Sequence, residues 1–432
     1  MILVQNRQQR LSGNKIQIVK FSFFAFIFLF VIASCAPKKG VLRSPDPRAG
    51  TAGQVKDGDS PSKTVTEVTP EEVKVVGKKN YENQIALVLP FQLDKVGTDS
   101  LGADDIKRSS LALDFYQGFQ LGLDELAKSG TNFTLNILDS RDNVSQNQTL
   151  ARSEDVQNAS IIIGPVYPTE IKTFGSNLTD KNILQVNPLA ASMPSEFNLP
   201  NLVSLTPSIR SHTRAIAGQV AKAYEPGDVV IIYNTSDADN RQFINGMQSE
   251  IKRLDVNANI ITVSTIEQLN EKLVIAGTNI IVTGTTNKFQ INALLNNLDS
   301  KSSEGLNTFK LFGHPLWSKF DFSANQNFAN YSPVISSESI LKKSSSPVRA
   351  LDELYRSTYG VSPSDHSYKG YDAARYFGKL IAKYGDDYAA HVVDENYSGI
   401  FSSYKFSKNN VYGYVNESVS FLQFRNGSFQ LR

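Results

Sequence analysis

Short apolar runs alternate with longer amphipathic stretches along the chain from Gln84 onward. Apolar runs such as residues 84–90 (QIALVLP) and 228–233 (DVVIIY) show no polar alternation, which is typical of strands buried on both faces of a parallel sheet. Between the runs, segments such as residues 108–130 carry apolar residues at helical spacing on one face. Because strand–helix units repeat, the pattern predicts parallel sheets with helices on both faces.

The repeat falls into two cycles, and we therefore expect two α/β lobes. Strands are predicted over residues 84–90, 133–139, 160–164, 182–186, 202–205, 228–233, 258–264, 279–283 and 309–312, with short tail strands over 399–406, 418–424 and 428–431. Helices are predicted over residues 108–130, 145–158, 167–180, 208–224, 239–254, 266–276 and 289–298, with two more within 348–384. In the first helix, Gly118 and Gly122 lie one turn apart, and we expect them to let the helix sit close to the sheet.

The first 34 residues follow a different pattern. Residues 1–20 carry basic side chains and no acidic one, and residues 21–32 form an apolar stretch that contains one serine, Ser22. About a dozen apolar residues are too few for a membrane span, which needs about 20. The arrangement predicts a secretory signal peptide over residues 1–34, with an uncleaved anchor as the alternative.

Cys35 follows small residues (Ala33-Ser34) in a stretch that resembles the lipobox of bacterial lipoproteins. The resemblance implies that the chain is cut before Cys35, and that this cysteine carries acyl chains such as palmitate and anchors the protein in a membrane. Residues 35–83 are rich in Pro, Gly, Ser and charged residues, and predict a flexible tether behind the lipidated cysteine. Ala36 occupies the position where Asp would favour the inner membrane, so we expect the periplasmic face of the outer membrane.

Composition narrows the functional classes. The chain has 432 residues, 41% of them hydrophobic, a formal net charge of +2 and one cysteine. Its length suggests two or three domains of about 150 residues each. The charge gives no reason to expect nucleic acid as a partner. A single cysteine excludes a disulfide scaffold and a cysteine-based metal cluster.

Six stretches, in this order and spacing, resemble the type I periplasmic binding proteins of the Leu/Ile/Val-binding-protein superfamily. Within it the chain is most similar to lipid-anchored envelope proteins, which include amino-acid transporter binding proteins and relatives of the penicillin-binding-protein activator LpoA. The resemblance implies an α/β fold of two Rossmann-like lobes with parallel sheets, joined by three crossover strands in a Venus-flytrap arrangement. The stretches are IALVLPF (85–91), FYQGFQLGLDEL (115–126), IIIGPVYPTE (161–170), NPLAAS (187–192), DVVIIYN (228–234) and YKGYDAARYF (368–377).

The resemblance also implies an order of segments. We expect the first part of lobe I over residues 84–206 and lobe II over 207–333. Residues 334–398 are then expected to return to lobe I, and strands within 399–432 to cross back to lobe II. The first two crossovers are expected near residues 205–208 and 331–336.

Open α/β sheets bind ligands beyond the carboxyl ends of their strands. In amino-acid-binding relatives, the loops after the third and fourth strands hold the ligand carboxylate through backbone amides and small hydroxyl side chains, which Thr169 and Ser192 match here. Tyr167 and Trp317, the only tryptophan, are candidates to stack on a flat or sugar-like ligand. The predicted ligand contacts are Tyr167, Thr169, Ala190, Ala191, Ser192, Asp239, Thr285 and Trp317.

One departure from the relatives concerns the ligand. Amino-acid binders place an acidic residue of the second lobe opposite the ligand ammonium. The corresponding stretches here, residues 284–288 (GTTNK) and 313–317 (GHPLW), contain no carboxylate. Asp237 and Asp239 are the remaining candidates, and the pattern does not favour an α-amino acid.

Motifs for catalysis are missing from the sequence. Its four histidines are scattered, and it contains no HExxH, GxSxG, Walker or GxGxxG motif. We therefore predict no catalytic residues, no metal and no cofactor. The first functional hypothesis is a lipid-anchored periplasmic protein that closes on a small solute, with an ABC permease as a possible partner. The alternative is an envelope lipoprotein of the same fold that binds or regulates peptidoglycan-synthesis machinery.

Overall fold

The computed structural model describes residues 83–97 and 101–432. The predicted signal peptide, Cys35 and all but the end of the tether lie outside these residues. The described residues belong to one compact unit that begins at Gly77. Among them, no helix combines the length and apolarity that crossing a membrane requires.

Lobe I is built on a seven-stranded sheet. Its strands are β1 (Gln84–Leu89), β2 (Thr134–Asp139), β3 (Ile161–Ile163), β4 (Leu184–Asn187), β5 (Leu202–Ser204), β13 (Phe406–Asn409) and β14 (Gly413–Asn416). Their order across the sheet is β13-β14-β5-β4-β3-β1-β2. All neighbours run parallel except β13 and β14.

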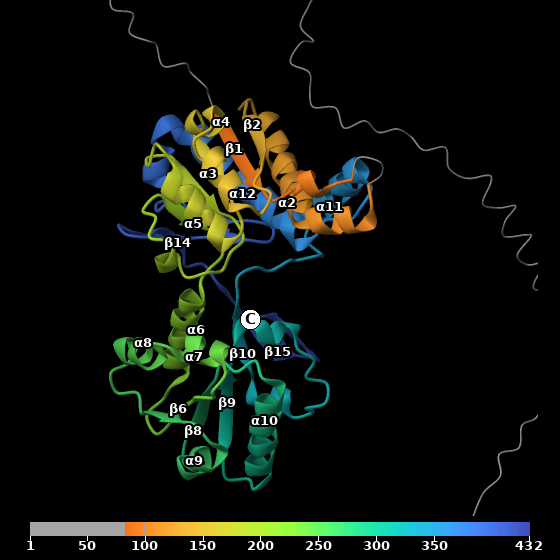
Figure 1. Cartoon of the computed structure of the whole chain (residues 1–432). Coiled ribbons are helices and arrows are strands. Elements are labelled where there is room, and N and C mark those ends of the chain that lie inside the picture. The colour runs from red at the N-terminus through yellow and green to blue at the C-terminus, as the bar shows by residue number, and fades with distance from the viewer. Residues whose placement is uncertain (1–82, 98–100) are drawn as a thin grey trace, which may run out of the picture. The chain divides into compact units, whose positions relative to one another are not determined.

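Helices cover both faces of this sheet, as the apolar run of β1 predicts. Leu87 packs with Phe115 and Phe377 in one core, whereas Val88 packs with Phe174 in the core of the opposite face. Figure 1 shows these helices around the sheet of lobe I. They are α2 (Ala103–Ala127), α3 (Val144–Leu150), α4 (Glu154–Gln157), α5 (Pro168–Asn177), α11 (Ser346–Tyr359) and α12 (Asp365–Tyr384).

Lobe II repeats the plan with a second seven-stranded sheet. Its strands are β6 (Val229–Tyr233), β7 (Ile260–Val263), β8 (Thr278–Val282), β9 (Thr308–Phe312), β10 (Val334–Ser337), β15 (Ser420–Arg425) and β16 (Ser428–Leu431). Their order is β16-β15-β10-β9-β8-β6-β7, with β15 and β16 antiparallel to their neighbours. Its helices are α6 (Ile209–Ala223), α7 (Ala238–Ile244), α8 (Met247–Leu254), α9 (Ile266–Glu271) and α10 (Lys288–Ser303). The predicted α/β fold of two lobes with mostly parallel sheets is confirmed.

The chain passes between the two sheets three times. The first crossing, residues 205–208, lies between β5 and α6, where the sequence predicts it. The second, residues 338–345, lies later than predicted, because β10 pairs with β9 and β15 inside lobe II. The third crossing, residues 417–419, joins β14 to β15.

Two expected segment boundaries are therefore wrong. Residues 334–337 belong to lobe II and not to the return segment. Residues 399–416 were expected to cross back to lobe II, but β13 and β14 extend the sheet of lobe I. The physical reason is that β5 leaves an open strand edge in lobe I, and β14 completes it in parallel register.

Two predicted helices are each broken in two. Residues 239–254 form α7 and α8, separated at Gly246, whose positive φ of 80° ends the helical path. Residues 145–158 form α3 and α4, with a turn at residues 151–153. The long first helix is a single element, but Gly118 packs against α12 and not against the sheet. A Cβ atom at Gly118 would lie 1.8 Å from the carbonyl oxygen of Ser367.

Candidate functional site

The loop after β3 brings Tyr167 and Thr169 to the carboxyl edge of the sheet of lobe I. Tyr167 is the N-cap residue of α5 and is half-buried, and Thr169 is exposed in the first turn. Burial, together with the carboxylates of Asp142 and Glu170, raises the pKa of the Tyr167 phenol. The phenol therefore stays protonated and remains a hydrogen-bond donor.

The side chain of Glu170 connects the first turn of α5 to α3. Its side chain is buried, and its Oε1 accepts a hydrogen bond of 2.9 Å from Nδ2 of Asn147 in α3. Burial raises the pKa of this carboxyl group, against the opposing effect of the hydrogen bond from Asn147. This hydrogen bond joins α3 to α5 and thereby helps to hold Tyr167, the N-cap residue of α5, in position.

Two hydrogen bonds join Asn187, the last residue of β4, to Ala190 in the loop that follows. The buried Asn187 accepts a hydrogen bond of 2.9 Å from the backbone N–H of Ala190 and donates one of 2.8 Å to the carbonyl of Ala190. The N–H of Ala190 is therefore already used and is not free to hold a ligand carboxylate. Ala191 is exposed and Ser192 is half-buried in this loop.

At the corresponding edge of lobe II, two carboxylates lie at the start of α7. Asp237 caps the helix through a 3.0 Å bond from the N–H of Asn240, and it accepts a 2.6 Å bond from Oγ1 of Thr235. Desolvation would raise the pKa of Asp237, but these hydrogen bonds outweigh it and lower the pKa. Asp239 is half-buried, and it accepts a hydrogen bond from the hydroxyl of Thr286. Thr286 belongs to the stretch that follows β8, so α7 supplies a carboxylate where the sequence of that stretch has none.

Trp317 and Thr285 lie beneath this edge and not on it. Trp317 has no exposed surface and packs among Phe322 and Phe328 in the core of lobe II. Its indole N–H donates a 2.8 Å hydrogen bond to the carbonyl of Thr285, and the side chain of Thr285 is also fully buried. The predicted contacts of Trp317 and Thr285 with a ligand are wrong for this structure, because the short turn after β9 folds the indole inward.

His314 is a residue of this edge that the sequence interpretation did not select. It follows β9 and is buried, and its Nδ1 accepts a 3.1 Å hydrogen bond from the N–H of Leu316. Burial lowers the pKa of His314 to about 4, although Asp239 and Asp237 act in the opposite direction. The imidazole is therefore neutral at pH 7. The sequence could have indicated His314 as a candidate site residue, because it is a polar residue just after the buried strand β9.

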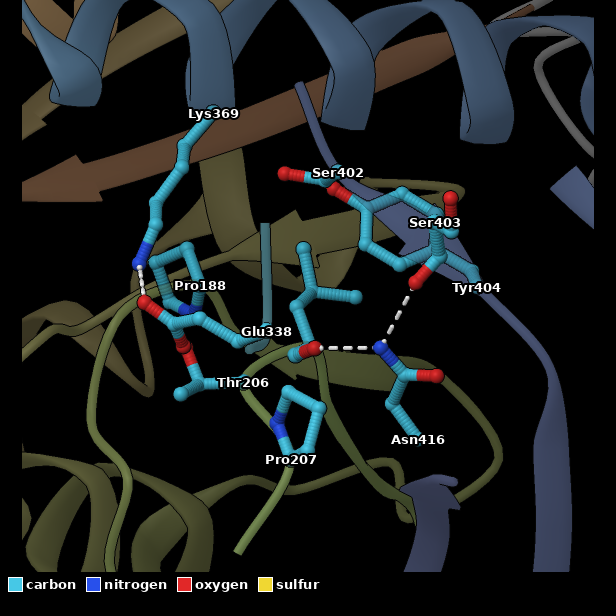
Figure 2. A pocket seen from close by; sticks show the side chains of 10 residues that line it. Pro188, Thr206, Pro207, Glu338, Lys369, Ser402, Ser403, Tyr404 and Asn416 are labelled. Atoms are coloured by element: carbon cyan, nitrogen blue, oxygen red, sulfur yellow. Dashed lines mark hydrogen bonds and ion pairs between the residues drawn. The ribbon is translucent and has the colours of Figure 1, made fainter. Parts of the chain in front are cut away.

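The crossings carry a second group of polar residues, shown in Figure 2. Asn416, at the end of β14, is buried and donates hydrogen bonds of 2.8 and 2.9 Å to the carbonyls of Leu205 and Ser403. Nearby, Lys369 of α12 forms a 2.8 Å ion pair with Glu338 at the start of the second crossing. The space enclosed beside these groups is about 10 Å³, which is room for about one water molecule.

A larger cavity of about 280 Å³ lies next to the second crossing. Ile340 and Phe401 contribute apolar surface, and Ser345 and Ser420 contribute hydroxyl groups. Its walls come from lobe I, the second crossing and lobe II. Among the residues that the structure describes, no group of three or more His, Cys, Asp and Glu side chains is placed to hold a metal ion.

Comparison with known proteins supports the fold. No protein-family model and no curated protein matches the chain. The fold is similar to that of a putative branched-chain amino acid ABC transporter protein from Rhodospirillum rubrum, at a TM-score of 0.58 and 15% identity over 81% of this chain and 100% of that one. It is also similar to an ABC transporter substrate-binding protein from Desulfitobacterium hafniense in complex with Leu, at a TM-score of 0.50 and 16% identity over 81% and 100% of the two chains. The expected type I periplasmic binding fold is thereby confirmed.

Proposed function

We propose that the protein binds a small solute between the carboxyl edges of its two sheets and presents it to an ABC transporter. The observation that carries the proposal is that polar side chains follow strands of both sheets at the edge where open α/β folds bind ligands. The structures with the same fold include substrate-binding proteins of ABC transporters, one of them in complex with Leu. The role proposed is binding and delivery without catalysis.

The two edges differ in chemistry, and this difference suggests the ligand class. Lobe I offers neutral donors, namely the phenol of Tyr167 and the hydroxyls of Thr169 and Ser192. Lobe II offers the carboxylate of Asp239, held by the hydroxyl of Thr286. Donors opposite a carboxylate suit a solute with an anionic end and an ammonium end. We therefore include small amino acids and short peptides, since α7 supplies the acidic group that residues 284–288 lack.

Lipid anchoring through Cys35 is the second part of the proposal. The lipobox-like residues before Cys35 and the long tether over residues 35–83 support a protein held at the periplasmic face of a membrane, and Ala36 favours the outer one. A palmitate analogue should label the full-length chain and not its Cys35→Ser variant. Equal labelling of both would contradict the proposal.

The binding function is tested by a thermal-shift screen of residues 77–432. The screen contains amino acids, short peptides, nucleobases, sugars and muropeptides. A ligand at 100 times its dissociation constant should stabilise the protein by about 2.7 kcal/mol, which raises its melting temperature by a few degrees. Absence of a shift with every compound class would contradict solute binding and would lead next to a search for a cell-wall partner.

The site is tested with a matched pair of substitutions. Asp239→Asn removes the carboxylate at the ligand edge, and we expect it to weaken binding of an ammonium-bearing ligand at least tenfold. Asp255→Asn is the control, because Asp255 lies before β7, at the opposite edge of the same sheet. Equal affinities of the two variants would exclude Asp239 from the site.

A further inference from the structure

Glu417 lies on the third crossing and contacts both lobes. Its Oε1 is 2.9 Å from Nη1 of Arg214, which lies on α6 of lobe II. The same oxygen accepts a 3.3 Å hydrogen bond from Oγ of Ser407, which lies on β13 of lobe I. One carboxylate oxygen therefore joins the two lobes.

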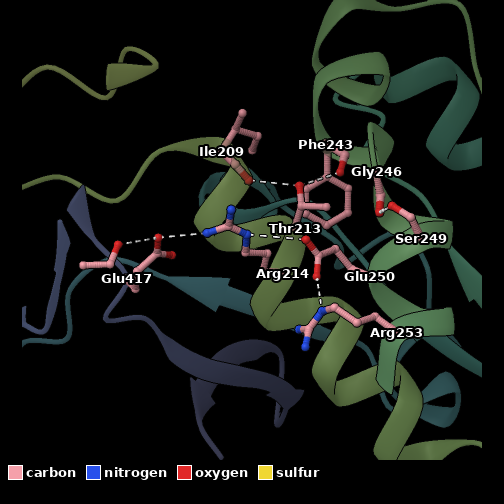
Figure 3. Close-up of polar contacts among 10 residues, drawn as sticks. Ile209, Thr213, Arg214, Phe243, Gly246, Ser249, Glu250, Arg253 and Glu417 are labelled. Carbon is pink, nitrogen blue, oxygen red and sulfur yellow. Dashed lines mark hydrogen bonds and ion pairs between the residues drawn. The ribbon is translucent and has the colours of Figure 1, made fainter. Parts of the chain in front are cut away.

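Arg214 is itself held within lobe II. Its Nε lies 3.5 Å from Oε1 of Glu250 on α8, and Glu250 also pairs at 3.0 Å with Arg253 of the same helix. Figure 3 shows Arg214 between Glu417 and Glu250. Because Glu250 fixes the guanidinium on the lobe II side, a rotation of the lobes changes the distance between Arg214 and Glu417.

The second crossing has an equivalent ion pair of the opposite orientation. The anion Glu338 lies at the start of the crossing, directly after β10 of lobe II, and the cation Lys369 lies on α12 of lobe I, at 2.8 Å. Lys369 is mostly buried, with 16% of its side chain exposed. This pair therefore joins the second crossing to α12 of lobe I.

The backbone at the crossings is held separately from these charges. Asn416 ties the first crossing to β14 through the carbonyl of Leu205, and its Oδ1 accepts hydrogen bonds from the N–H groups of Lys405 and Ser418. These contacts are between an asparagine side chain and peptide groups at or next to the crossings. The ion pairs instead join a crossing to a helix, α6 in one pair and α12 in the other, so a rotation of the lobes would change their lengths.

We propose that the ion pairs Arg214–Glu417 and Lys369–Glu338 form a latch that sets the balance between two arrangements of the lobes. The pairs stabilise the arrangement in which all four side chains meet, and ligand affinity changes with the population of that arrangement. This last step rests on the proposed function, but the balance itself does not require a ligand. Partly exposed ion pairs of this kind change an equilibrium by about two- to fivefold each.

The test measures the distance between the lobes by single-molecule energy transfer without ligand. The fragment is residues 77–432, because both sheets and all described cores lie within it. Cys35, the only cysteine, is outside this fragment, so two introduced cysteines can be labelled cleanly. Lys107→Cys on α2 and Lys319→Cys after β9 place exposed labels on lobe I and lobe II.

Two test variants are each compared with a control of the same chemistry. Glu417→Gln removes the charge shared by the lobes, and Glu304→Gln removes the partner of Lys301 in a 2.8 Å pair that stays within lobe II. Lys369→Gln removes the second pair, and Lys383→Gln removes a 2.6 Å pair with Glu395 that stays within lobe I. The controls disturb equally polar pairs that do not span a crossing.

We expect Glu417→Gln and Lys369→Gln each to shift the ratio of the two distance populations by about two- to fivefold, while both controls leave the ratio unchanged. Raising the salt concentration should move the wild-type ratio in the same direction, because salt screens exposed charges. The latch is rejected if the test variants match their controls, or if every variant shows one unchanged distance. Failure here would leave solute binding standing, because the screen described above measures it independently.

Discussion

Trp317 shows that a tryptophan just after a strand can lie either at a ligand site or in the hydrophobic core. As the only tryptophan and close to the end of a strand, it was predicted to stack on a ligand. The structure instead gives its N–H a backbone partner, the carbonyl of Thr285, and covers the ring with phenylalanines. A buried tryptophan whose N–H is satisfied stabilises the core, so its position after a strand did not reveal its role.

A substitution distinguishes these two roles. We expect Trp317→Phe to lower the free energy of unfolding by about 1–3 kcal/mol, because a buried carbonyl loses its donor and a cavity forms. Ligand affinity should not change. Acrylamide should quench the native Trp317 fluorescence poorly, and it should quench the fluorescence of the control Leu316→Trp/Trp317→Phe strongly, because Leu316 is exposed. Strong quenching of native Trp317, or its protection by a ligand, would contradict the buried placement.

His212 makes the stability depend on pH. It is buried on α6, and its Nδ1 lies 2.8 Å from Oγ of Ser336 on β10. Burial lowers the pKa of His212 from 6.5 to about 4, with Glu338 acting in the opposite direction and His314 in the same direction. Between these two pH values the unfolded state binds more protons than the folded state, so lowering the pH favours unfolding.

We therefore expect the contribution of neutral His212 to be complete above about pH 6.5 and to be lost as the pH falls to about 4. The loss approaches roughly 3 kcal/mol. Urea unfolding of the wild type and of His212→Gln at several pH values measures this loss. Burial also raises the pKa values of the carboxyl groups of Glu170 and Asp372, but both proteins contain these groups, so the effects of their titration cancel in the difference. The advantage of the wild type should shrink steadily on acidification. A difference that is independent of pH would show that His212 does not titrate in this way.

At the scale of elements, α2 and α12 pack with their backbones unusually close. A Cβ atom at Gly118 would lie 1.8 Å from the carbonyl oxygen of Ser367, and one at Gly370 would lie 2.1 Å from that of Phe115. The stretches FYQGFQLG and YKGYDAAR, both part of the family resemblance, are thus the two sides of one helix contact. Glycine is required here by the space between the helices and not by an unusual backbone angle.

The same substitution at two helical glycines should have opposite effects. Gly118→Ala should destabilise the protein by about 1–3 kcal/mol or prevent folding, because the methyl group meets backbone. Gly218→Ala in α6 should stabilise it by about 0.5–1 kcal/mol, because the nearest atom would lie 4.0 Å away and Ala favours helix. Thermal unfolding of both variants measures this. Stabilisation by Gly118→Ala would show that α2 and α12 are not packed as described.

Local patterns predicted the elements well where the signal was continuous. Runs such as those of β1 and β6 are apolar throughout because each face of each sheet is covered, and the fold class follows from their repetition. Strand β14 was missed because its residues, GYVN, are short and partly polar, and its parallel partner β5 lies about 210 residues earlier in the chain. The candidate site was predicted in the same way. The strand ends gave Tyr167, Ser192 and Asp239, but no local pattern distinguishes an inward indole from an outward one.

At the scale of the whole molecule, the side chain of Asn416 holds two of the three crossings to lobe I. It holds Leu205 of the first crossing, Ser403 and Lys405 of lobe I and Ser418 of the third crossing. Each lobe has its own cores, so the two could unfold independently if the crossings were loose. Because these hydrogen bonds order two crossings at once, we expect the native lobes to unfold together.

Asn416→Ala should uncouple them. It leaves buried peptide groups without partners, at a cost of about 1–3 kcal/mol, and it releases the crossings. In urea unfolding, Trp317 fluorescence reports lobe II alone, whereas far-ultraviolet circular dichroism reports both lobes. The two signals should coincide for the wild type and separate for Asn416→Ala. Asn279→Ala is the matched control, because Asn279 makes its hydrogen bonds within lobe II only, to Val274 and Thr308. The unfolding transition of this variant should shift to a lower urea concentration, and its two signals should still coincide. Coincident signals in Asn416→Ala would mean that packing between the lobes, and not this asparagine, couples their unfolding.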